Sequence, residues 1–305
     1  MSEPQLIIIG GGPAGMAAAL YAGRAMINTL LIEKIAPGGQ MLWTDKVDNY
    51  LGFPDGVLAY ELVEKMAAHA RRFGVKEMAG EVSNIESDEA HGCVHVKVGD
   101  KLFSPNAVIV ATGASPRRLG VKGEAEFTGK GVSYCATCDA AFFKDQKVAV
   151  VGGGDTAVQE AVFLTRFASK VYIIHRRDRF RAVKILAQRA LSDPKIEPIW
   201  NTIVEEIEGD SVVSALALRN KVTGEPKRLP VDGVFVFIGM DPNTGFVPDA
   251  AKKDGQGFLI TDEWMRTSLP RVFAAGDCRS KPLRQIITAV GDGATAAFAA
   301  EQLIE

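Results

Sequence analysis

The chain has 305 residues, of which 47% are hydrophobic and 24% charged, a composition that can bury one large core or two ordinary ones and speaks against disorder. Its formal net charge of −2 gives no long-range attraction to nucleic acid or to an anionic membrane surface. No apolar run approaches the roughly 18 residues of a membrane-spanning helix, and the opening MSEPQL carries an acid where a signal peptide would be basic. We therefore expect a two-domain cytoplasmic protein that binds neither nucleic acid nor membranes.

The first predicted elements are a strand, a tight turn, a helix and a second strand within residues 5–34. An apolar β-branched run, a glycine cluster and helical apolar spacing follow one another there. The glycines have the GxGxxG spacing: Gly10 permits the turn, Gly12 lets the backbone approach a pyrophosphate, and Gly15 lets the helix pack closely on the strand. Glu33 ends the second strand, where a carboxylate can accept hydrogen bonds from an adenosine ribose. A single copy of this pattern leaves a purely structural turn as the alternative.

Polar residues come next, in the segment 35–54, which contains Gly39, Gln40 and Asn49. Taken alone, this segment is also compatible with an ordinary surface turn. Residues 106–113 then predict a buried strand that ends at Gly113, followed by a proline-containing exit from the domain.

Two cysteines, Cys135 and Cys138, stand in the stretch SYCATCD, a few residues before a second copy of the strand-turn-helix-strand pattern. The spaced small residues of this copy are Gly152, Gly154 and Ala157. Two copies, each flanked by strand and helix, favour two dinucleotide sites over two structural turns. The free N–H groups at each helix N-terminus would face the phosphates.

We predict no redox or metal-binding role for the other cysteines or for the histidines outside the second copy. A zinc site made of all four cysteines is not favoured, because Cys93 and Cys278 stand apart from the single CxxC. We interpret these two cysteines as inert, and His69, His91 and His95 as surface or structural residues. No metal site is expected.

A basic run in the second copy replaces the acid of the first. Glu33 lies 33 − 10 = 23 positions after Gly10, and His175 lies 175 − 152 = 23 positions after Gly152. The run HRRDRFR supplies Arg176, Arg177 and Arg181, whose planar guanidinium groups suit a 2′-phosphate. The second site is therefore predicted to prefer NADPH over NADH. The alternatives are a solvated basic face or a minor phosphate-binding patch for nucleic acid.

The last segment, residues 270–305, predicts a strand that ends at Gly276 and Asp277 and then a long apolar helix. An acid at the carboxyl end of a strand can reach a polyol chain, which flavins possess and nicotinamide dinucleotides lack. We therefore expect one flavin site and one nicotinamide site, with Gln40 and Asn49 able to address the isoalloxazine ring.

Together these elements predict an α/β fold with two Rossmann-like dinucleotide-binding domains, the second inserted into the first. The crossings are placed near Gly113 and near Gly239, where a strand leaves through a Gly/Pro/Asn turn. The expected FAD-binding domain comprises residues 1–113 and 241–305, and the NADPH-binding domain with the CxxC comprises residues 114–240.

Over essentially its whole length, the sequence resembles the low-molecular-weight, bacterial-type thioredoxin reductases. The motifs that carry the resemblance are Gly10-Gly11-Gly12-Pro13-Ala14-Gly15, Gly38-Gly39-Gln40, Ala111-Thr112-Gly113, Cys135-Ala136-Thr137-Cys138-Asp139, Gly152-Gly153-Gly154, His175-Arg176-Arg177 with Arg181, and Gly276-Asp277 with Arg284-Gln285. The stretch CATCD placed before the second glycine motif is the most specific of them.

The resemblance implies a homodimer that passes electrons from NADPH to FAD, then to the cysteine pair, then to thioredoxin. It makes Cys138 the thiol nearest the flavin, Cys135 the thiol that attacks thioredoxin, and Asp139 the acid–base group. Because the nicotinamide and the dithiol belong to one domain and must both reach the flavin, we expect that domain to rotate about its two crossings.

The residues expected to bind the cofactors are Gly10, Gly12, Pro13, Ala14, Gly15, Glu33, Lys34, Gly39, Gln40, Asn49, Ala111, Thr112, Gly113, Gly276, Asp277, Arg284, Gln285 and Ile286, with Gly152, Gly154, Asp155, Thr156, His175, Arg176, Arg177 and Arg181. One position departs from the family, which usually has glycine directly after the aspartate, where this chain has Ala140. An alanine there would strain a turn with positive φ but would favour a helix.

Four alternatives remain. A related flavoprotein disulfide reductase would use another acceptor, and a ferredoxin–NADP reductase-like enzyme would need no dithiol, so Cys135 and Cys138 speak against the second. The reductase of a peroxidase system usually carries extra N-terminal domains, whereas this chain begins at its first dinucleotide strand. A redox-sensing module without turnover would fail to oxidise NADPH continuously in the presence of a disulfide.

Overall fold

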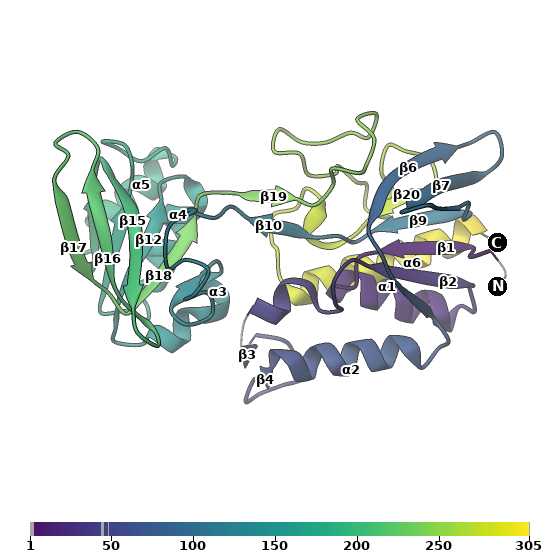
Figure 1. Cartoon of the computed structure of the whole chain (residues 1–305), viewed down its shortest axis with the longest axis horizontal. Helices are drawn as coiled ribbons and strands as arrows, with labels where there is room; N and C mark the ends of the chain where they lie inside the picture. The colour runs from purple at the N-terminus through teal and green to yellow at the C-terminus, as the bar shows by residue number, and fades with distance from the viewer. Residues whose placement is uncertain (1–2, 44–45, 48, 305) are drawn as a thin grey trace. The chain divides into compact units, whose positions relative to one another are not determined.

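The computed structural model describes residues 3–43, 46–47 and 49–304 (Figure 1). The chain divides into two compact units: Met1–Ser115 with Asp241–Glu305, and Pro116–Met240. The second unit is one continuous segment inserted between two parts of the first. Two strands at the crossings, β10 (Ala114–Pro116) and β19 (Met240–Pro242), pair with each other in a two-stranded sheet.

The first unit is built on a five-stranded parallel sheet with the order β20-β9-β1-β2-β5. Its strands are β1 (Leu6–Ile9), β2 (Thr29–Glu33), β5 (Lys76–Ala79), β9 (Ala107–Val110) and β20 (Val272–Ala274). The central strands β1 and β9 have the sequences LIII and AVIV and are buried at every position. Such continuous apolar runs are expected where both faces of a parallel sheet are covered.

Helices cover one face of this sheet and a small antiparallel sheet covers the other (Figure 1). The helices are α1 (Pro13–Arg24), α2 (Ala59–Arg71) and α6 (Ile286–Ile304), and the antiparallel strands are β6 (Val82–Asp88), β7 (Cys93–Val98) and β8 (Lys101–Phe103). Helix α6 packs directly on α1 because Gly293 has no side chain, and a Cβ there would stand 2.0 Å from the carbonyl oxygen of Ala14. The short elements of this unit are η1 (Gly39–Trp43), β3 (Lys46–Val47), β4 (Val57–Leu58) and η3 (Gly276–Cys278).

The second unit repeats this plan. Its parallel sheet has the order β11-β18-β12-β13-β14, and a three-stranded antiparallel sheet, β15-β16-β17, accompanies it. The strands are β11 (Val132–Ser133), β12 (Lys147–Gly152), β13 (Lys170–Ile174), β14 (Ile196–Ile199), β15 (Thr202–Gly209), β16 (Val213–Asn220), β17 (Pro226–Pro230) and β18 (Gly233–Phe237). The helices are α3 (Ala136–Asp139), η2 (Ala140–Phe143), α4 (Asp155–Leu164) and α5 (Lys184–Ser192). The predicted α/β fold with two strand-turn-helix-strand units is therefore confirmed as β1-α1-β2 and β12-α4-β13.

In the part of the chain that the structure describes, none of the helices combines the length and the apolar character needed to cross a lipid bilayer.

Candidate functional site

The three spaced glycines of the first turn, Gly10, Gly12 and Gly15, have three different environments. Gly10 has φ of +107°, and a Cβ on it would stand 2.5 Å from the backbone oxygen of Ala111. A Cβ on Gly15 would stand 1.8 Å from the backbone oxygen of Gly10, so no larger residue fits. Gly12, the N-cap of α1, has open space within 4 Å of its Cβ position. This combination of tight turn, open approach and close packing is the one that a bound pyrophosphate requires.

Glu33, at the end of β2, is fixed by two backbone N–H groups. Its Oε2 accepts a hydrogen bond from Gly11 at 2.6 Å, and its Oε1 accepts one from Ile35 at 3.0 Å. A carboxylate has about four acceptor positions, so Glu33 can still accept from the hydroxyls of a ribose beside the glycine turn. Lys34 instead pairs with Glu81 at 2.7 Å on an exposed surface.

Asp277, in η3, places an unsatisfied carboxylate oxygen inside the first unit. Its Oδ1 is buried and has no hydrogen-bond partner among the described residues, and the same is true of Nε of Arg284. Burial raises the pKa of Asp277, although the charges of Lys281 and Arg284 act in the opposite direction. A buried carboxylate oxygen needs a donor, and the hydroxyls of a flavin's polyol chain would supply it. The residues present therefore fit the expected FAD.

A buried ion cluster behind Asp277 was not predicted from the sequence. Asp292 of α6 binds Arg279 at 3.0 Å and Lys281 at 2.6 Å, with side chains only 12%, 16% and 5% exposed, respectively. The same carboxylate accepts the N–H of Gly276 at 3.1 Å, so it ties the Gly276 turn to α6. An acid within the otherwise apolar start of α6 was the available signal.

Two amide side chains of the 35–54 segment bond to distant parts of the first unit. Gln40 donates from Nε2 to a backbone oxygen of β10 at 2.5 Å, and Asn49 donates from Nδ2 to Oε1 of Gln285 at 2.9 Å. Thr112 donates to the backbone oxygen of Asn243 at 2.7 Å. Residues from three separate predicted segments therefore meet, and Asn243 joins them without having been predicted.

The second glycine turn reproduces the first with changed details. Gly152 has φ of +154°, and a Cβ there would stand 2.4 Å from the backbone oxygen of Phe237. Around the Cβ position of Gly154, the nearest atom is Nη2 of Arg181 at 4.0 Å. The ring of His175 packs under the turn, since a Cβ on Gly153 would stand 2.3 Å from its Nδ1. His175 is buried, and burial, followed by the charge of Arg181, lowers its pKa.

The predicted arginines line a pocket of about 650 Å³ after β13. Its lining residues are Arg176, Arg177, Asp178, Arg179, Phe180, Arg181 and Asn201. Arg179 and Asn201 were not predicted, although Arg179 belongs to the same basic run. Asp155 accepts the N–H of Val183 at 2.8 Å and so fixes the end of this loop to the start of α4. Four guanidinium groups around one pocket suit a phosphate dianion, which fits the expected NADPH; Thr156 lies exposed at the start of α4.

The cysteine pair forms a disulfide across the first turn of α3. Cys135 is the N-cap and Cys138 lies within the helix, with 5.3 Å between their Cα atoms. Both residues are half-buried, and the Sγ of Cys135 lies 3.4 Å from Oγ1 of Thr137. Ala140 has φ of −54° and continues into η2, so the alanine is in a helical conformation and carries no strain.

Ser133 holds the aspartate beside the disulfide. Its hydroxyl donates to Oδ2 of Asp139 at 2.6 Å and accepts the N–H of Cys135 at 3.1 Å. The strand β11, the first cysteine and the carboxyl group are thus joined by one hydroxyl. A serine two positions before a cysteine was too common a feature to single out, so Ser133 was not predicted.

Known proteins resemble this chain in sequence and in fold. Residues 4–293 match the pyridine nucleotide-disulphide oxidoreductase family. The thioredoxin reductase of Listeria monocytogenes is 48% identical over 98% of this chain and 93% of its own length, and that of Bacillus subtilis is 46% identical over 100% and 97%. A solved structure of thioredoxin reductase from Streptococcus pyogenes superposes with a TM-score of 0.93 at 47% identity, covering 98% of this chain and 97% of that one.

The chain therefore belongs to the pyridine nucleotide-disulphide oxidoreductases and, within them, to the bacterial-type thioredoxin reductases. Members of this group depend on FAD and NADPH, so the expectation of one flavin and one nicotinamide cofactor is confirmed.

Proposed function

We propose that this chain reduces the disulfide of an oxidised thioredoxin with two electrons from NADPH. The observation that carries the proposal is the Cys135–Cys138 disulfide, which lies in the same unit as the arginine pocket and has Asp139 hydrogen-bonded beside it through Ser133. When bound, FAD supplies a two-electron carrier between a nicotinamide and a disulfide. A one-electron reductase of the ferredoxin–NADP type has no use for the dithiol.

The two units divide the cofactors in this proposal. Residues 1–113 with 241–305 bind FAD through the turn at Gly12, the carboxylate of Glu33 and the unsatisfied oxygen of Asp277. Residues 114–240 bind NADPH through the turn at Gly154 and the arginine pocket. The support for this division is chemical: the first site offers carboxylates to hydroxyl groups, and the second offers guanidinium groups to a phosphate.

The reduced cysteine pair exchanges with the substrate in two steps. The thiolate of Cys135 attacks one sulfur of the thioredoxin disulfide, which breaks that bond and releases one substrate thiolate. Cys138 then attacks the sulfur of Cys135, so that the Cys135–Cys138 disulfide forms again and the second substrate thiol leaves. Asp139 gives a proton to a departing thiolate. The sum is NADPH, one proton and one disulfide converted to NADP⁺ and two thiols.

Electron transfer also requires motion in this proposal. The nicotinamide and the disulfide belong to one unit, and each must reach the flavin of the other unit in turn. We propose a rigid-body rotation about the crossings at residues 113–116 and 239–242, where the chain passes between the units.

The deciding experiment measures NADPH oxidation with and without oxidised thioredoxin, for the wild type and for Cys135→Ser and Cys138→Ser. We expect both variants to lose thioredoxin reduction by at least a thousandfold. Both should still reduce ferricyanide with NADPH, because that acceptor does not need the dithiol. Thioredoxin turnover that persists in Cys135→Ser would refute the assigned role of this thiol.

We further propose that two chains form a homodimer that works in the cytoplasm. The dimer follows the resemblance to low-molecular-weight thioredoxin reductases, and the partly exposed stacked pair Trp264 and Phe298 in the first unit, 6.2 Å apart, offers an apolar contact surface. The location follows from the chemistry, since reduced thiols are maintained in that compartment. Light scattering of the purified protein tests the first point and cell fractionation the second.

A further inference from the structure

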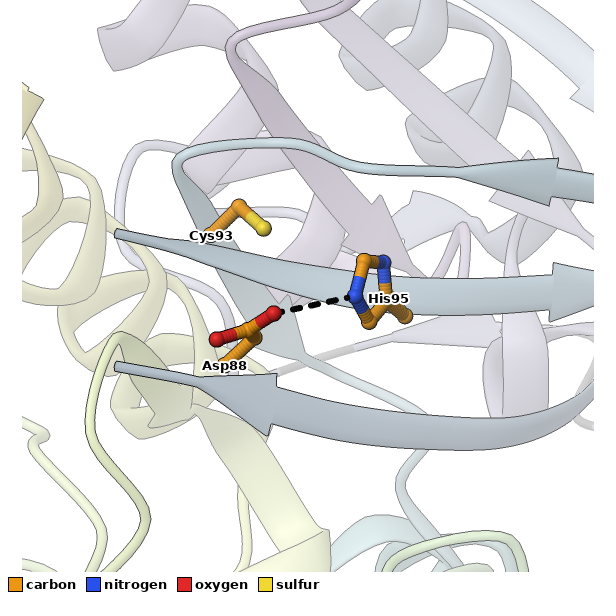
Figure 2. A group of neighbouring side chains, drawn as sticks. All are labelled: Asp88, Cys93 and His95. Carbon is orange, nitrogen blue, oxygen red and sulfur yellow. Dashed lines mark ion pairs between the residues drawn. The ribbon is translucent and has the colours of Figure 1, made fainter. Parts of the chain in front are cut away.

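Three side chains of metal-binding type meet on the first unit: Asp88, Cys93 and His95 (Figure 2). In the hairpin of β6 and β7, Asp88 pairs directly opposite Cys93. Cys93 and His95 are two positions apart on β7 and therefore share a face. The residues of the other face, Val94 and Val96, are 0% exposed and belong to the core. Core packing thus fixes all three polar side chains on one side of the hairpin.

The spacing of these groups suits a tetrahedral ion. The candidate ligand atoms of Asp88, Cys93 and His95 all lie within 4.8 Å of one another, and Oδ2 of Asp88 is 3.4 Å from Nε2 of His95. Bonds of about 2.0–2.1 Å at the tetrahedral angle separate an oxygen and a nitrogen ligand by about 3.3 Å, and a sulfur from either by about 3.6 Å. The carboxylate and the imidazole therefore already stand at the required separation, and the sulfur must approach by at most about 1.2 Å.

Neighbouring groups orient the ligands. Nδ1 of His95 is hydrogen-bonded to Oγ of Ser104 at 3.0 Å, which leaves Nε2 facing Asp88. Metal-binding histidines usually bond through their second nitrogen in this way. The other oxygen of Asp88 accepts the N–H of His91 at 3.1 Å. The ring of His91 is 79% exposed, and its Nδ1 lies 2.8 Å from Oδ2 of Asp88, so His91 helps to hold this carboxylate in place.

We propose that Asp88, Cys93 and His95 bind one Zn²⁺ per chain, with a water molecule as the fourth ligand; we name this group the hairpin site. Cys93 is a free thiol, and on binding it exchanges its proton for a sulfur–zinc bond. The thiolate and the carboxylate then neutralise the two charges of the ion. A ligand set of sulfur, nitrogen and oxygen suits zinc, whereas magnesium and calcium prefer oxygen alone. The ion would join β6 and β7 beside the turn that connects these two strands.

The test uses the oxidised, FAD-loaded full chain, in which Cys135 and Cys138 form a disulfide and cannot bind metal. Zn²⁺ alone is titrated calorimetrically at pH 7.5. We expect one ion per chain with a Kd in the micromolar range or tighter, and at least a tenfold weaker Kd in Cys93→Ser, in His95→Gln and in Asp88→Asn. The matched control is His69→Gln, a histidine on α2 outside the hairpin site, which should bind as the wild type does.

A second measurement needs no variant. Saturating Zn²⁺ should slow the alkylation of Cys93 by iodoacetamide at least tenfold, as read by mass spectrometry of the peptide. Binding weaker than millimolar, equal binding by the wild type and Cys93→Ser, or an unchanged alkylation rate would each overturn the proposal.

Discussion

Replacing Asp277 by asparagine should change FAD affinity and the stability of the FAD-free protein in opposite directions. The variant keeps the shape of the side chain but removes the charge from a buried group whose Oδ1 has no hydrogen-bond partner among the described residues. A hydrogen bond to a charged group contributes about 1.5–3 kcal/mol and a neutral one about 0.5–1.5 kcal/mol. The difference of about 1–1.5 kcal/mol predicts a 5- to 15-fold weaker affinity for FAD.

The FAD-free protein should become no less stable, because the variant removes a buried charge. Burial raises the pKa of Asp277 above its ordinary value near 3.8, so the folded state holds this proton more tightly than the unfolded state. Stability attributable to this carboxyl is therefore present at lower pH and is lost as the pH rises from near 3.8 through the raised pKa. The asparagine variant should lack that loss, so its advantage over the wild type grows across this window.

Fluorescence titration of FAD-free protein with FAD, and thermal unfolding without FAD, measure the two effects. Asp292→Asn is the matched control: it breaks a buried pairing with Arg279 and Lys281 and should cost about 3–5 kcal/mol. An unchanged FAD affinity in Asp277→Asn would show that the carboxylate does not face the cofactor. A fall in the FAD-free melting temperature like that of Asp292→Asn would show that the carboxylate is satisfied by the protein.

Four further variants probe other parts of the site. Changing both Arg176 and Arg177 to serine should lower kcat/KM for NADPH by a factor that corresponds to about 2–4 kcal/mol of transition-state stabilisation. The kcat/KM for NADH should stay nearly unchanged. Equal losses for the two coenzymes in steady-state kinetics would show that the arginines do not bind the 2′-phosphate. Ser133→Ala removes the hydroxyl bonded to the neighbouring aspartate and should slow thioredoxin reduction about 5- to 10-fold but not ferricyanide reduction. Gly15→Ala should destabilise the FAD-free protein by about 1–3 kcal/mol, as measured by calorimetry. Gly12→Ala places its methyl group in open space, so it should weaken only FAD binding, as measured by FAD titration.

The sequence predicts best where function depends on local backbone chemistry. The buried runs of β1 and β12, the glycines after them and the helices that follow are encoded within about thirty residues each, so hydrophobic spacing and turn chemistry suffice to find them. The position of Gly10 illustrates this: its φ of +107° excludes other residues whatever surrounds the turn.

Features that depend on distant pairings were not predicted. The antiparallel sheets β6-β7-β8 and β15-β16-β17 were not predicted, although Gly99 and Gly224, both with positive φ, stand in turns between their strands. Asp292 joins Gly276 only because α6 packs on α1. Cys93 and Asp88 are close in the sequence, but they face each other only in the register that the hairpin of β6 and β7 adopts. Asp292 stands out in the sequence only as an acid in the apolar start of α6, and this signal does not identify a partner, so the fold is needed to reveal its contacts.

The insertion of one unit into the other also orders events during synthesis. Residues 241–305 supply the edge strand β20 and the helix α6 of the first unit, and they leave the ribosome after the whole of Pro116–Met240. The inserted unit can therefore fold first. Until α6 has been synthesised, the apolar surface that β1 and α1 present to it stays exposed. We expect a released chain that ends at residue 240 to show a protease-resistant inserted unit and a sensitive N-terminal segment. The first unit would be a client for chaperones until α6 closes over α1.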